Sequence, residues 1–174
     1  MNLPLRILAS LAVVAGATYA VWLILLPGYT CNIARDRVTR RFDQLQGMRN
    51  SAAEVARPGI GRENTRDLIP CVESPGRSIH DFVMLAESAR LLGNTERAAE
   101  LYEQALRFEP RPELYYQQAL LQLELHRRTE ARRMLLLAGY SAQYINLFPD
   151  TELRDSVTDK LGEREKLLRA KLAR

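Results

Sequence analysis

The strongest constraint on this chain is an uncharged apolar stretch near its amino terminus. No Asp, Glu, Lys or Arg lies between Arg6 and Arg35. The apolar run of residues 7–26 is about as long as a bilayer core is thick, at the rise of an α-helix. Residues 1–30 are therefore predicted to be an uncleaved transmembrane anchor, with residues 7–27 in the lipid bilayer.

Three other interpretations of this stretch fit less well. A cleaved signal peptide has an apolar region of roughly 7–15 residues, and cleavage after Ala20 would leave further apolar residues exposed. A lipoprotein signal needs small residues directly before Cys31, where Tyr29 and Thr30 stand instead. A buried core helix of this length is rarely apolar on every face.

The rest of the chain has the composition of one small helical domain. Leu, Ala, Arg and Glu dominate it, and all four favour helix. The net charge is only +4, and no region is basic enough to indicate nucleic-acid binding. We expect an all-α fold in which a single transmembrane helix precedes a compact helical array.

Residues 31–78 are predicted to be a helical connector or a degenerate repeat. Apolar residues at helical spacing predict a first helix over residues 34–48. The "RPGIG" of residues 57–61 predicts a break, after which a short helix ends near Pro70. The Pro-Gly loop of residues 73–78 then separates this part from the next.

The segment from residue 81 to residue 110 predicts an antiparallel helical hairpin with its turn at "LGNT". Its first apolar stripe consists of Phe82, Leu85, Ala86 and Ala89, and its second of Ala98, Leu101, Tyr102, Ala105 and Leu106. The alanines let two helices approach closely. Gly93 suits the end of the first helix and Pro110 ends the second.

This pattern resembles a tetratricopeptide repeat (TPR). The matching residues are Phe82, Leu85, Ala86, Gly93, Ala98, Tyr102, Ala105 and Pro110. Ala89 departs from the family, which usually has Tyr there. A second, degenerate copy is expected 34 residues later, with Tyr116 in the place of Phe82. The resemblance covers residues 79–146 and implies a short solenoid of helical hairpins.

Residues 147–174 are predicted to be a capping helix. Pro149 precedes its start, with Asp150 or Thr151 as the N-cap. Its apolar stripe consists of Leu153, Val157, Leu161, Leu168 and Leu172. One apolar face and one charged face are what the end of a solenoid needs.

The TPR resemblance implies a groove, lined by the first helix of each repeat, that holds an extended peptide or a partner helix. The groove positions fall on His80, Val83, Glu87, Arg90, Leu114, Gln117, Leu121 and Glu124. The alternative is that so short an array has no groove and these residues pack on neighbouring helices.

Cys31 and Cys71 are the only cysteines and match no metal-binding pattern. A disulfide between them would contribute about 4 kcal/mol and suit a periplasmic domain; the alternative is two buried thiols. The arginines of residues 35–41 instead favour a cytoplasmic domain. We expect a single-pass protein of the bacterial inner membrane and leave the side open, with the periplasm preferred.

A basic cluster at the predicted turn of the second repeat consists of Arg127, Arg128, Arg132 and Arg133. It can contact anionic lipid headgroups or an acidic partner. The interpretation we favour is a solvated helix start, partly paired with neighbouring glutamates.

No constellation for catalysis is recognisable, and His80 and His126 lack metal-ligand spacing. We predict no enzyme, cofactor, metal site or small-molecule substrate. The predicted function is a membrane-anchored protein-interaction module, acting as a scaffold, assembly or accessory subunit of a membrane complex. The alternatives are a chaperone-like factor that binds clients transiently, and an accessory subunit of a membrane enzyme or cofactor-bearing complex.

Overall fold

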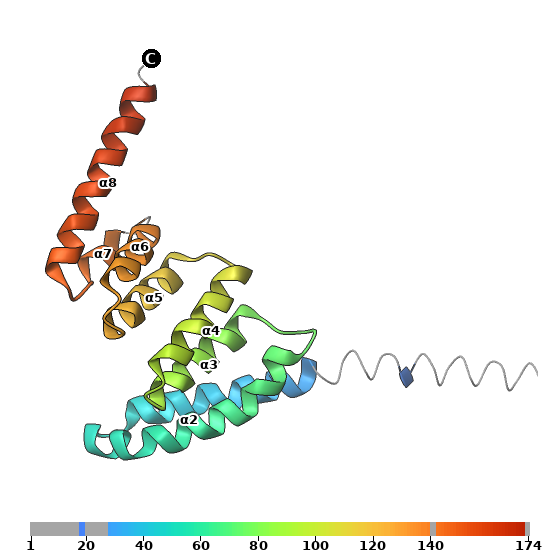
Figure 1. Ribbon diagram of the computed structural model, residues 1–174. Coiled ribbons are helices and arrows are strands. Elements are labelled where there is room, and N and C mark those ends of the chain that lie inside the picture. Colours follow the sequence, from blue (N-terminus) through green and yellow to red (C-terminus); the bar gives the residue numbers. More distant parts are fainter. Residues whose placement is uncertain (1–17, 20–27, 140–141, 173–174) are drawn as a thin grey trace, which may run out of the picture.

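The computed structural model describes residues 18–19, 28–139 and 142–172, and these ranges contain helices and no strand (Figure 1). The all-α prediction is confirmed for this part of the chain. A helix covering residues 28–47, called the N-terminal helix below, comes first. It is followed by α2 (Asn50–Glu73), α3 (Ile79–Leu91), α4 (Thr95–Phe108), α5 (Pro112–Glu124), α6 (Arg128–Ala138), α7 (Ala142–Asn146) and α8 (Thr151–Leu172).

The predicted membrane anchor, residues 7–27, lies outside the described residues except for Thr18 and Tyr19. Among the helices that are described, none combines the length and the hydropathy needed to cross a bilayer. The anchor therefore stays a prediction from the sequence.

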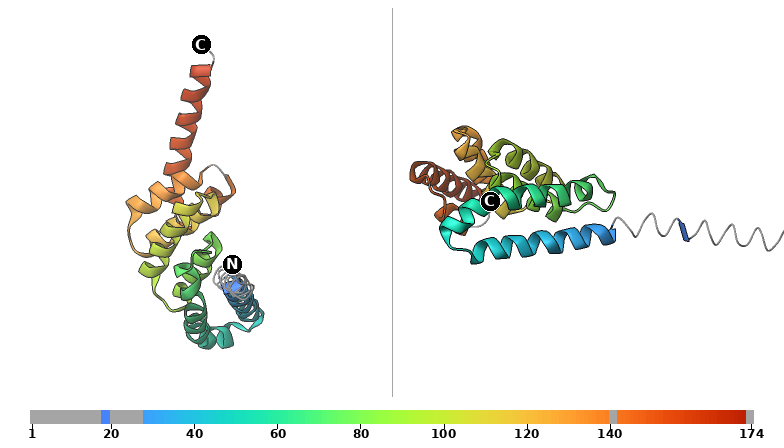
Figure 2. Two further views of the ribbon diagram at one scale, coloured as in Figure 1. Left: turned by 90° about the vertical axis from the view of Figure 1, so that its right-hand side faces the viewer. Right: turned by 90° about the horizontal axis from the view of Figure 1, so that it is seen from below.

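The N-terminal helix runs antiparallel to α2, and the right-hand view of Figure 2 shows the two lying alongside each other. A disulfide joins Cys31 to Cys71 with a Cα–Cα distance of 5.4 Å, and both residues are buried. Further along the pair, Arg41 Nη1 lies 2.8 Å from Asp67 Oδ2 and 3.2 Å from Asn64 Oδ1. The first hairpin is thus fastened by a covalent bond at one end and by ionic contacts near its middle.

Three successive hairpins follow one another along the array, and two larger apolar cores run through them (Figure 1). The first core joins the N-terminal helix to α5, and its members include Val38, Leu68, Phe82, Leu85, Tyr102 and Leu121. The second joins α5 to α8, and its members include Ala119, Ala131, Leu135, Phe148, Leu153 and Val157. Helix α5 contributes side chains to both.

The α3–α4 hairpin forms as the sequence predicts. Ala86, Ala98 and Ala105 are completely buried, so the helices meet at their small residues. Gly93 has a φ of 72°, a backbone conformation that glycine adopts without steric cost. Asn94 then caps α4, because its side-chain oxygen accepts the Arg97 N–H at 3.1 Å.

The second hairpin repeats the first after 33 residues, not 34. Helix α5 begins at Pro112 and α3 at Ile79, a difference of 33; α6 begins at Arg128 and α4 at Thr95, again 33. The predicted register of the second copy is wrong by one residue. Pro112 accounts for the early start, since a proline has the φ of a helical residue and needs no N–H partner in the first turn.

His126 occupies the position that Gly93 holds in the first hairpin, and its φ is 58°. Because a side chain in this region costs about 1–2 kcal/mol, we expect His126→Gly to raise the free energy of unfolding by about 0.5–1 kcal/mol. Urea unfolding followed by circular dichroism would measure it. The same substitution at His80, in the first turn of α3, should instead lower stability, by less than about 1 kcal/mol. Stabilisation at both positions, or at neither, would contradict the explanation.

The predicted break at residues 57–61 is also wrong, because α2 continues through Pro58 and Pro70. Gly61 explains how. A Cβ at this position would lie 2.9 Å from Leu92 Cγ and 3.0 Å from the Ser88 carbonyl oxygen. The glycine therefore lets α2 and α3 approach closely, and burial of the residues along this contact outweighs the local cost of proline and glycine in a helix.

Two glycines of α2 should respond in opposite ways to alanine. Gly61→Ala is expected to destabilise the protein by about 1–2 kcal/mol, because the new methyl group pushes α2 from α3. Gly59 has nothing within 4 Å of its would-be Cβ. Gly59→Ala should therefore stabilise by about 0.5–1 kcal/mol through helix propensity alone. Equal effects of the two substitutions in urea unfolding would refute the close packing.

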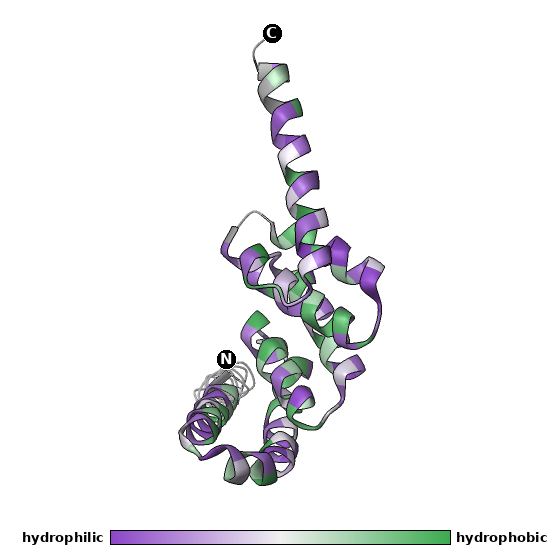
Figure 3. Cartoon of the chain, turned by 90° about the vertical axis from the view of Figure 1, so that its left-hand side faces the viewer, coloured by the Kyte–Doolittle hydropathy of each residue, from purple (hydrophilic) through white to green (hydrophobic). Residues whose placement is uncertain are grey.

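Helix α8 caps the array with only its amino-terminal half. Asp150 is the N-cap, since its Oδ1 accepts the Leu153 N–H at 3.0 Å, as predicted. Leu153 and Val157 are buried and Leu161 packs against the second core, whereas Leu167 is 65% exposed. Figure 3 shows the carboxyl-terminal half projecting away from the other helices.

Candidate interaction surface

Four of the predicted groove residues lie on one face of α3. His80, Val83, Glu87 and Arg90 recur at helical spacing; His80 is exposed and the other three are half-buried. Arg90 Nη2 lies 3.5 Å from Glu124 Oε1, so this face meets α5. This ion pair is the contact between α3 and the end of α5 on this face, and the groove that the resemblance implies stays a prediction.

On α5 the predicted residues divide into two groups. Leu114 and Leu121 are 5% and 0% exposed and belong to the first apolar core. They are not part of a surface, because the one-residue change of register turns them inward. Gln117 is half-buried and Glu124 is exposed. The surface called the α3/α5 face below consists of His80, Val83, Glu87, Arg90, Gln117 and Glu124.

Polar contacts connect three residues of the α3/α5 face, Glu87, Arg90 and Glu124. The Tyr102 hydroxyl of α4 donates a hydrogen bond to Glu87 Oε1, and Arg90 Nη1 lies 3.5 Å from the same oxygen. Burial, followed by the negative charge of Glu87, raises the pKa of Tyr102 well above its ordinary value. Tyr102 therefore remains a protonated donor, and it orients Glu87 at the surface.

An ion pair that sequence reasoning missed fixes α3 against the N-terminal helix. Arg35 binds Asp81 through Nε at 2.6 Å and Nη2 at 2.8 Å, and the Asp81 side chain is completely buried. The Ser78 N–H also donates to Asp81 at 2.7 Å, which completes a capping box at the start of α3. The Ser-x-x-Asp spacing could have predicted the cap, but no sequence signal identifies Arg35.

The pKa of Asp81 reflects these contacts. Burial by itself would raise it, but the hydrogen bonds from Arg35 and Ser78, together with the charge of Arg35, hold the pKa below its ordinary value. The carboxylate is therefore charged at neutral pH and acts as a structural link.

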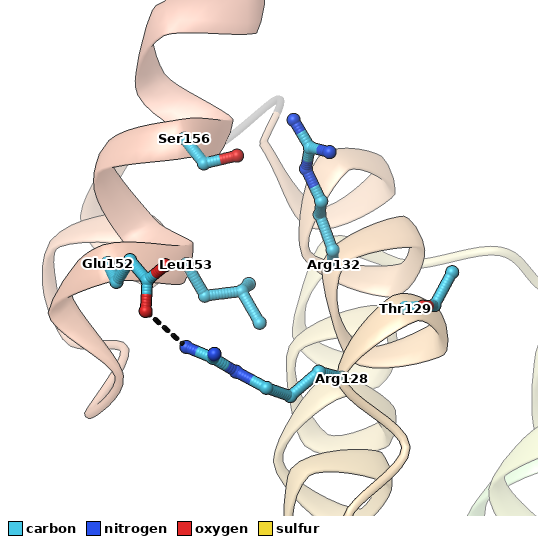
Figure 4. Close-up of a pocket in the computed structure, with 6 residues that line it drawn as sticks. All are labelled: Arg128, Thr129, Arg132, Glu152, Leu153 and Ser156. Atoms are coloured by element: carbon cyan, nitrogen blue, oxygen red, sulfur yellow. Dashed lines mark hydrogen bonds and ion pairs between the residues drawn. The ribbon is translucent and has the colours of Figure 1, made fainter.

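The predicted basic cluster is largely matched by carboxylates. Arg128 Nη2 lies 2.8 Å from Asp150 Oδ2 and 2.9 Å from Glu152 Oε2, which ties α6 to α8. Figure 4 shows the contact between Arg128 and Glu152. It lies beside a shallow cavity with a volume of about 230 Å³, which Arg132 and Ser156 also line. The ion pairs of the cluster are Arg127 with Glu96, Arg128 with Asp150 and Glu152, and Arg133 with Glu130. These contacts favour the interpretation as a partly paired helix start.

The two histidines occupy different elements of the fold. His80 lies at the start of α3 and His126 in the α5–α6 turn. Within the described residues, no three His, Cys, Asp or Glu side chains lie so that they could hold a metal ion.

No protein-family model matches the chain, and no curated protein matches its sequence. The TPR resemblance therefore stays a prediction.

Proposed function

We propose that this chain is a membrane-tethered protein-interaction module, in which a transmembrane anchor holds a short TPR-like solenoid. It acts as a scaffold, assembly or accessory subunit of a bacterial membrane complex. The observation that carries the proposal is the helical hairpin repeated after 33 residues. Repetition of this kind builds an extended surface from several helices, which is how solenoids bind other proteins.

The anchor and its compartment are supported by two features. The uncharged apolar run of residues 7–26 has the length of a bilayer core. The disulfide between Cys31 and Cys71 suits an oxidising compartment, so we place the helical domain on the periplasmic side of the inner membrane. Tethering in two dimensions raises the effective concentration of the domain for partners in the same membrane.

The α3/α5 face is the surface we assign to the partner. It combines an apolar residue, Val83, with carboxylates, an arginine and an amide. Such a mixture, mainly polar with one apolar side chain, is typical of the rim of non-obligate protein interfaces. The ion pair between Arg90 and Glu124 spans α3 and α5, so a partner lying across both helices would contact it.

Affinity purification from detergent-extracted membranes tests the proposal. A subunit should recover one partner in a fixed molar ratio, whereas a chaperone-like factor should recover a variable mixture of clients. Recovery of the chain alone after in-cell crosslinking, or in the soluble fraction, would contradict the tethered module.

A matched pair of variants tests the assigned face. Glu124→Arg and Glu103→Arg each reverse one exposed charge and break one ion pair with an arginine, Arg90 and Arg107 respectively. Only Glu124 belongs to the α3/α5 face. We expect Glu124→Arg to reduce partner recovery several-fold and Glu103→Arg to leave it unchanged; the reverse result would assign the partner to α4.

A further inference from the structure

An apolar pocket opens between α2, α3 and α4, on the side of α3 opposite the α3/α5 face. Its volume is about 160 Å³, and its lining includes Leu85, Ala89 and Leu101. Ile69 and Leu92 also line it and are 42% and 38% exposed. Cavities of about 150 Å³ accept a benzene ring, so this pocket has room for one large side chain.

Arginines lie on two of the helices that form this pocket, α2 and α4. On α2, Thr65 and Ile69 line the pocket, and Arg62 and Arg66 lie beside them on the same stripe of the helix, at i, i+3, i+4 and i+7. Both arginines are exposed. From α4, Arg97 lines the pocket as well.

These arginines carry more positive charge than their neighbours neutralise. Arg97 Nη1 lies 2.8 Å from Glu100 Oε2. The acidic neighbours on α2, Glu63 and Asp67, bind Arg41 of the N-terminal helix instead. In the part of the chain that the structure describes, neither Arg62 nor Arg66 forms an ion pair.

We propose that this pocket binds an acidic partner segment that inserts one large aliphatic or aromatic side chain and places carboxylates over Arg62 and Arg66. A side chain that fills a pocket is the usual anchor of a protein interface. Guanidinium groups bind carboxylates with two parallel hydrogen bonds, so the rim selects acidic residues beside the anchor. The inference rests on the proposed function and adds to it a second surface and the chemistry of its partner.

Peptide selection on the full-length protein in nanodiscs of zwitterionic lipid tests the inference. Phage-displayed peptides selected on the wild type should be enriched in Asp and Glu around one large apolar residue. The selected peptide should bind about tenfold more weakly to the R62E/R66E variant, and selection on that variant should favour Lys and Arg. Arg57→Glu is the control, because Arg57 is exposed and lies opposite Arg66 on α2. The selected peptide should bind this variant as tightly as it binds the wild type.

Filling the pocket provides an independent test. Thr65→Phe should abolish peptide binding while the thermal unfolding curve stays that of a folded protein. Peptides that bind the wild type and R62E/R66E equally would overturn the proposal, as would binding that survives Thr65→Phe in a folded variant. If laurate occupies the pocket and no acidic peptide is selected, the site takes a small amphiphile and the proposal fails.

The outcome for the pocket is separable from that of the proposed function. If the pocket is not a docking site, membrane purification still recovers the partner in fixed ratio from R62E/R66E cells. If the proposed function is wrong, the wild type itself recovers no partner.

Discussion

Replacing both Cys31 and Cys71 with serine is expected to lower the free energy of unfolding by about 4 kcal/mol. The two residues lie 40 positions apart, so their bond removes much of the conformational freedom of the unfolded chain. The loss should appear in guanidinium unfolding of the full-length protein in detergent, followed by circular dichroism. The m-value, which is the slope of the free energy of unfolding against denaturant concentration, should also increase. The reason is that the unfolded chain without the disulfide is less compact and exposes more surface.

Reduction supplies the control for this experiment. The wild type unfolded with a reductant present should behave like the C31S/C71S variant, whereas the variant should not respond to the reductant. Identical midpoints for the oxidised wild type and the variant would show that the bond contributes nothing. Such a result would also remove the main support for a periplasmic domain.

The Asp81→Asn substitution should destabilise the protein by about 3 kcal/mol at pH 7. It leaves the half-buried guanidinium of Arg35 without its carboxylate and weakens the capping box with Ser78. Chemical unfolding of the two proteins would measure the difference. Glu103→Gln, which breaks an exposed pair with Arg107, serves as the control and should leave stability unchanged.

The pH dependence of stability shows whether Asp81 stabilises the protein through its negative charge or only through its packing. The pKa of Asp81 is lower in the folded protein than in the unfolded chain, where an aspartate has a pKa of about 4. The stabilisation is therefore complete above that pH and is lost as the pH falls through the folded-state pKa. The wild type and Asp81→Asn should converge in acid; a difference that stays constant from pH 7 to the lowest pH at which the protein folds would contradict the ion pair.

Local sequence patterns predicted the central hairpin well because its determinants are local. The alanine stripes and the turn glycine at residue 93 each act within one or two helical turns, as does the cap at Asp150, which starts α8. Their geometry follows from the chain itself. The all-helical architecture follows from the same short-range preferences.

One error arose where a contact between distant segments decided the outcome, and the other where a local signal was overlooked. Residues 57–61 look like a break, but the close approach of α2 to α3 at Gly61 keeps the helix continuous. The second repeat was assigned one residue late because Tyr116 resembles Phe82, and Pro112 was not used as a helix start. This single shift placed Leu114 and Leu121 at a surface when both are in the core.

The missed features depend on which helices become neighbours. The contact between Arg35 and Asp81 joins residues 46 positions apart. The pocket between α2, α3 and α4 depends in the same way on the packing of three helices. Neither follows from periodicity within one segment.

The position of the disulfide also determines how the protein transmits mechanical force. If residues 7–27 anchor the chain as the sequence predicts, and a partner bound to α3 or α5 is pulled away from the membrane, tension reaches Cys31 and crosses the sulfur–sulfur bond directly to Cys71. Residues 32–70 are bypassed, so this part of the first hairpin bears no load along its backbone. The domain therefore extends under tension only when the helices after residue 71 unfold.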